Sequence, residues 1–77
     1  MTTNLLAQRI EDVLTPVVGT VLAAVSVEVE AKRLGKDPDS ITRDDLGPLA
    51  DNLATALVLV VGKDLADAAA GQVRMLA

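Results

Sequence analysis

Carboxylates come closest to forming a chemical site in this chain of 77 residues. Four aspartates lie between residues 37 and 46, where an EF-hand calcium loop would set acidic ligands at alternate positions and a bidentate acid at the twelfth. The register does not fit, because placing Asp45 at the twelfth position puts Leu34 and Lys36 at the first and third. A helix start accounts for the same acids, with Thr42 as the expected cap and Asp45 at the capping-box position. We therefore predict no calcium site here.

No other residue pattern predicts catalysis or metal binding. The chain has no histidine and no cysteine, which removes the usual general base near neutral pH and the commonest nitrogen and sulfur metal ligands. Glu28 and Glu30 are two residues apart, so on a helix they point in different directions. Ser26 and Ser40 have no basic partner that would activate a nucleophile. The sequence predicts a non-enzymatic protein with no catalytic residue, no cofactor and no metal.

The composition also argues against nucleic acid as a partner. The formal net charge is −4, and the seven basic residues are scattered, with only 32–36 approaching a basic cluster. Binding to DNA or RNA needs a basic face that releases counterions. There is also no Phe, Tyr or Trp on which a base could stack. We therefore expect no nucleic-acid partner.

The apolar segments are too short for a membrane span. The two longest runs without a charge are 13–27 and 52–62, whereas a bilayer-spanning helix needs about 20 residues. The N-terminal residues lack the basic segment and apolar stretch of a signal peptide. Together with the absence of cysteine, these features lead us to expect a soluble, cytoplasmic protein.

Helical periodicity dominates the chain and predicts an all-α fold. Two main helices are expected, over about 4–34 and 42–61, with the first kinked or broken near Pro16. A short C-terminal helix is expected over 64–76, with Asp64 as its cap. Dimerisation of such chains would form a helical bundle.

One stretch of the first helix has a competing interpretation. Residues 24–32 include an alternation of apolar and polar side chains that is also typical of a strand. The helix is favoured because it pairs Glu28 with Lys32, and because no second segment alternates over a comparable length. No internal repeat is apparent, and residues 1–77 are expected to form a single helical oligomerisation domain.

The charge-free run 13–27 predicts self-association. A helix of a two-layer domain needs an apolar stripe a little over ~100° wide, whereas this run is apolar around most of its circumference. One hairpin covers only one face of each helix, and each fully exposed Val or Leu forgoes about 1.5–3 kcal/mol of burial. Pairing of two hairpins would cover the remaining faces. The predicted interface comprises Val17, Val18, Val21, Leu22, Val25, Leu57 and Val60.

The expected function follows from this association. The chain would act as a small scaffold or regulatory protein whose partner is a second copy of itself, in a homodimer or higher oligomer, or another helical protein. Aspartate in place of Val21 or Val25 is expected to unfold the protein. Two alternatives remain open: a module whose dimer interior binds an acyl chain or another apolar ligand, and a short helical hairpin associated with a membrane.

Overall fold

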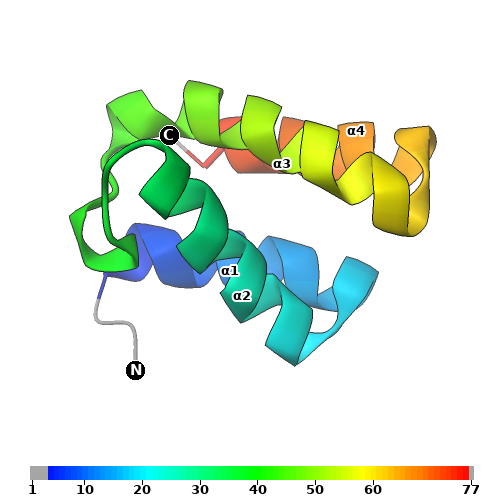
Figure 1. Cartoon of the computed structure of the whole chain (residues 1–77), viewed down its shortest axis with the longest axis horizontal. Coiled ribbons are helices and arrows are strands. Elements are labelled where there is room, and N and C mark those ends of the chain that lie inside the picture. The colour runs from blue at the N-terminus through cyan, green and yellow to red at the C-terminus, as the bar shows by residue number, and fades with distance from the viewer. Residues whose placement is uncertain (1–3, 77) are drawn as a thin grey trace.

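A computed structural model describes residues 4–76 as four α-helices, in place of the two main helices and one short helix expected (Figure 1). The helices are α1 (Leu5–Val18), α2 (Thr20–Arg33), α3 (Leu46–Val61) and α4 (Lys63–Arg74). Two 3₁₀ turns between α2 and α3 are η1 (Pro38–Ser40) and η2 (Arg43–Asp45). Residues 4–76 contain no strand, which confirms the all-α class and the helical interpretation of 24–32. None of these helices is both long enough and apolar enough to span a membrane.

The helices form two hairpins that lie one above the other. In Figure 1, α1 and α2 make the lower hairpin, and α3 and α4 make the upper one. Contacts within each hairpin are more extensive than those between hairpins, where α1 packs on α4 and α2 packs on α3. Both sharp helix-to-helix joints lie at the right of Figure 1, and the segment that links the hairpins lies at the opposite end. One chain therefore supplies four packed helices.

The first main helix is broken as expected, but the break falls at Gly19, three residues beyond Pro16. Pro16 lies inside α1 near its end, where its missing N–H removes one helical hydrogen bond without stopping the helix. Gly19 has φ of 88° and ψ of 164°, a conformation that essentially only glycine adopts. Its N–H donates to the Thr15 carbonyl (2.8 Å), and its carbonyl accepts from the Ala23 N–H (2.9 Å). A single residue thus ends α1 and begins α2.

The same joint occurs a second time at Gly62. This glycine has φ of 88° and ψ of 168°. Its N–H donates to the Val58 carbonyl (3.0 Å), and its carbonyl accepts from the Ala66 N–H (3.1 Å). Because the Gly62 carbonyl already accepts the first helical hydrogen bond, α4 begins at Lys63 with no side-chain cap. The prediction that Asp64 caps this helix is therefore wrong.

The two joints belong to an internal repeat, so the expectation of no repeat is also wrong. Residues 14–23 and 57–66 share the pattern Leu-x-x-Val-Val-Gly-x-x-Leu-Ala, at an offset of 43 residues (62 − 19). The repeat is difficult to recognise in the sequence because the shared pattern is short and the flanking residues are mostly not identical. At this offset many buried positions of the hairpins coincide, pairing Ala7 with Ala50, Ile10 with Leu53, Leu14 with Leu57, Ala23 with Ala66, Val27 with Ala70, and Glu30 with Val73.

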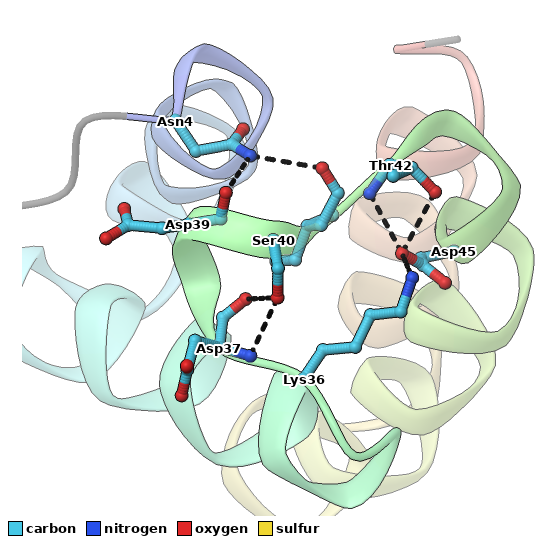
Figure 2. Close-up of polar contacts among 8 residues, drawn as sticks. Asn4, Lys36, Asp37, Asp39, Ser40, Thr42 and Asp45 are labelled. Atoms are coloured by element: carbon cyan, nitrogen blue, oxygen red, sulfur yellow. Dashed lines mark hydrogen bonds and ion pairs between the residues drawn. The ribbon is translucent and has the colours of Figure 1, made fainter.

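Asn4 joins the start of α1 to the segment between the hairpins (Figure 2). Its Oδ1 accepts hydrogen bonds from the N–H groups of Leu6 (2.8 Å) and Ala7 (3.1 Å), and so caps α1. Its Nδ2 donates to the carbonyls of Asp39 (2.9 Å) and Ile41 (3.1 Å). One amide side chain therefore fixes a helix start and a distant loop at once.

Most residues that helical spacing predicts to face inward are buried, with one clear exception in α4. The spacing in 64–76 predicts that Leu65, Ala69, Val73 and Leu76 face inward. Ala69 and Val73 are buried, but Leu65 is exposed, and α4 packs through three alanines and Val73. Small side chains allow α4 to lie close against α3, which accounts for the extensive contact between these two helices. The buried apolar residues are Ala7, Ile10, Leu14, Ala23, Val27, Ala31, Ile41, Leu46, Leu49, Ala50, Leu53, Leu57, Ala66, Ala69, Ala70 and Val73.

Candidate association surface

The seven residues of the predicted interface are placed in three ways. Leu57 is only 2% exposed and belongs to the core of a single copy. Val17 and Val18 are partly buried and pack against that core. The exposed members, which remain open to a second copy, are Val21, Leu22, Val25 and Val60.

Helix α2 carries apolar side chains on two opposite faces. The inner face is buried and consists of Ala23, Val27, Glu30 and Ala31. The outer face carries four exposed residues with helical spacing, here called the α2 outer stripe: Val21, Leu22, Val25 and Val29. Val21 is 76% exposed, more than any other member. The sequence pattern gave no way to tell that the smaller side chains of α2 would face its own core.

A second group of exposed apolar residues surrounds the joint between α3 and α4. This Gly62 cluster consists of Val58, Leu59, Val60 and Leu65. Leu59 is 90% exposed, and only Val60 of the cluster was predicted to lie in an interface. The sequence feature that could have identified Val58 and Leu59 is the continuous apolar run 57–61, which places apolar side chains on every side of the last turn of α3. Leu65 and Leu22 occupy the same repeat position, so each hairpin exposes a leucine just beyond its joint.

An ion pair borders one end of the α2 outer stripe. The Nζ of Lys32 lies 3.2 Å from Oε1 of Glu28, and both side chains are more than half exposed. Such an exposed pair contributes only about 0.3–0.5 kcal/mol to helix stability. The stripe therefore has a charged end near Lys32 and an uncharged end near Thr20.

Glu30 is the one charged side chain buried within residues 4–76, at 3% exposure. Its Oε1 lies 3.3 Å from Nε of Arg33, but the geometry is not that of a hydrogen bond. The equivalent position in the second hairpin is Val73, an ordinary core residue. A buried carboxylate is costly unless it is paired, so Arg33 is the group that offsets this charge.

The Asp45 carboxylate connects Lys36 and Thr42 within the segment between the hairpins (Figure 2). Oδ2 of Asp45 accepts hydrogen bonds from the Thr42 N–H (2.9 Å) and Oγ1 (3.1 Å) and lies 2.7 Å from Nζ of Lys36. The hydrogen bond from Lys36, and then that from the Thr42 N–H, hold the pKa of Asp45 below its ordinary value. The capping box predicted for Thr42 and Asp45 is present, but it caps the η2 turn that precedes α3, and α3 itself begins at Leu46. Within residues 4–76 no three acidic side chains gather as metal ligands would.

Comparisons with models of protein families, with curated proteins and with solved structures find no match to this chain. The function has therefore to be inferred from the exposed surfaces and charges of the chain itself. Of these, the α2 outer stripe and the Gly62 cluster are the features most at odds with a solitary small domain.

Proposed function

We propose that this chain is a self-association module, a small non-enzymatic scaffold or regulatory protein whose copies pair through the α2 outer stripe. The observation that supports it is the second apolar face of α2. One face is already buried in its own chain, and the other presents Val21, Leu22, Val25 and Val29 to solvent. A helix with apolar side chains on both faces is typical of one that is packed on both sides.

The energetics indicate that the stripe needs help from the Gly62 cluster. Given their exposed fractions, burial of the four stripe residues would contribute roughly 3–6 kcal/mol from each copy. Association itself costs about 4–15 kcal/mol in lost freedom of motion. The burial of two stripes alone would therefore exceed the cost of association only if that cost lies in the lower part of its range. Burial of the similarly exposed Gly62 cluster would provide the surplus that pairing at micromolar concentration requires.

The charges favour an antiparallel arrangement of two α2 helices. In a parallel pair, Glu28 would lie beside Glu28 and Lys32 beside Lys32 of the other copy, and like charges across an interface are unfavourable. In an antiparallel pair centred on Val25, the charged end of each stripe lies beside the uncharged end of the other.

Charge substitutions in the stripe test this proposal. Val21→Asp and Val25→Asp place a carboxylate at the centre of the contact, and light scattering should then show dissociation to single copies that keep a helical circular dichroism spectrum. These side chains point away from the core, so dissociation replaces the unfolding that was expected from the sequence. Gln72→Glu adds the same charge at an exposed site on α4 and should leave the mass unchanged. Variants with the wild-type mass would refute a contact through α2.

A further inference from the structure

The structure has a small open cavity whose lining residues come from both ends of the described chain and from the segment between the hairpins. In Figure 1 the start of α1 and the segment between the hairpins lie at the end of the fold opposite the two glycine joints. The cavity lies between the start of α1, the η2 turn and the residue pair that follows α4, and its volume is about 180 Å³. The lining combines three leucines with two arginines: Leu5, Leu6, Leu76, Arg9 and Arg43. This end of the fold is remote from the Gly62 cluster, and the proposed association does not use it.

The two arginines differ from every other basic residue of the chain. Five of the seven Lys and Arg residues have a carboxylate within ion-pair distance, in the pairs Lys32–Glu28, Arg33–Glu30, Lys36–Asp45, Lys63–Asp67 and Arg74–Asp51. Among residues 4–76, no carboxylate lies within that distance of Arg9 or Arg43. The two basic residues without an acidic partner among residues 4–76 are therefore the two that line one cavity, although they are 34 positions apart (43 − 9) in an acidic chain.

We propose that this cavity binds a small organic carboxylate with a compact apolar body. Guanidinium groups present a planar fork of donors that matches a carboxylate, and two of them supply more positive charge than one bound carboxylate needs. The leucines would contact the apolar body, which an inorganic anion lacks. A cavity of about 150 Å³ is known to hold benzene, so one of similar size accepts a single ring or a short branched chain. Pockets for larger ligands are typically about 300–1,000 Å³.

Benzoate is a suitable probe, and amide chemical shifts of the isotope-labelled protein provide the measurement. Titration should give saturable shift changes at residues 5, 6, 9, 43 and 76, with a dissociation constant on the order of 1 mM for so small a ligand. Benzyl alcohol, which keeps the ring and loses the charge, should bind at least tenfold more weakly. Sodium phosphate, which keeps charge and loses the ring, should cause no saturable change at the leucines.

Arginine variants decide whether the two guanidinium groups carry the binding. Arg9→Gln and Arg43→Gln should each weaken benzoate binding about 5- to 10-fold, the loss expected for a charge-assisted hydrogen bond in a partly open site. Both side chains are exposed, so the helical spectrum should be unchanged. Lys63→Gln removes the same charge beside the Gly62 joint and should bind benzoate as the wild type does.

Four results would each overturn the proposal: absence of saturable shifts, equal binding of benzyl alcohol, equal binding of phosphate, or unchanged affinity in both arginine variants. Equal binding of phosphate counts among them because the leucines would then have no role. These results do not depend on the mass of the assembly, so the cavity and the α2 contact are tested separately.

Discussion

Glu30 depends on one neighbour, Arg33, which lies 3.3 Å away and is itself mostly exposed. Arg33→Gln would leave a buried carboxylate without compensation and should lower the free energy of unfolding by about 1 kcal/mol. The expected loss is no larger because solvent screens the mostly exposed Arg33 side chain. In a Glu30→Gln background the same substitution should have almost no effect. Urea denaturation at a fixed protein concentration measures both changes. An equal loss in the two backgrounds would show that Arg33 does not act through Glu30.

Asp45 should make the stability of the protein sensitive to acid. Because Lys36 and Thr42 lower the pKa of the folded-state carboxyl, the charged form adds stability above the unfolded-state pKa of about 3.9, and this stability is lost as pH falls through the lowered folded-state pKa. Asp45→Asn should therefore be less stable than the wild type at pH 7, and the difference should shrink below about pH 4. Thermal denaturation across this range provides the measurement. Asp44→Asn, at an exposed position one residue earlier, is the control and should show a much smaller difference at pH 7.

Each hairpin turns at one glycine joint, Gly19 or Gly62. The role of Gly19 can be tested by comparing its substitution with that of a glycine inside a helix. Gly19→Ala forces alanine into a conformation with positive φ and should cost about 1–3 kcal/mol. Gly71→Ala, inside α4, should instead stabilise by about 0.5–1 kcal/mol, because alanine favours the helix. A Cβ at either position would meet no neighbouring atom within 4 Å, so the two substitutions differ only in the backbone conformation that alanine must adopt. Chemical denaturation of both variants should show opposite signs, and a shared sign would contradict the role of the joint.

Much of each helix could be predicted from local sequence. The apolar spacing of Ile10 and Leu14 in α1, and of Leu49 and Leu53 in α3, identifies faces that are buried. Asn4 caps α1 as a residue of its type should. These features depend on side chains within a turn or two of one another, which is why a single sequence is enough to find them.

The joints and the orientation of α2 could not be predicted in the same way. Pro16 is a strong local signal for a helix break, yet the chain turns at Gly19. The packing of α1 against α2 requires a backbone conformation at this joint that glycine adopts readily and other residues rarely adopt. α2 is apolar on both faces, so its periodicity does not decide which face is buried. The meeting of Arg9 and Arg43 at one cavity likewise depends on tertiary structure, because Arg9 lies in α1 and Arg43 lies in the segment between the hairpins.

The orientation of the proposed assembly can be tested with engineered cysteines, because the chain has none of its own. Antiparallel α2 helices centred on Val25 bring the two copies of that residue together, so Val25→Cys should form a disulfide-linked dimer on mild oxidation. Val21→Cys alone should not, whereas a mixture of Val21→Cys with Val29→Cys should. Non-reducing electrophoresis measures the yields. Efficient self-linking of Val21→Cys would indicate a parallel arrangement instead.

The whole molecule presents two separate surfaces. The α2 outer stripe and the Gly62 cluster offer apolar area for a second copy, and the cavity at the opposite end combines apolar and basic groups. The cavity and the Gly62 cluster lie at opposite ends of the molecule, but its longest extent is only 28 Å. Occupation of the cavity and pairing of copies are nevertheless independent expectations, because no residue belongs to both.

The central claim is that a single copy leaves too much apolar surface exposed to remain alone. Sedimentation equilibrium of the unmodified protein tests this claim most directly. Concentrations from about one to one hundred micromolar are suitable, because they are on the order of the dissociation constant expected for such a contact. We predict a mass of at least twice 8.0 kDa that declines on dilution, together with a helical circular dichroism spectrum. A folded species of 8.0 kDa throughout this range would contradict the account.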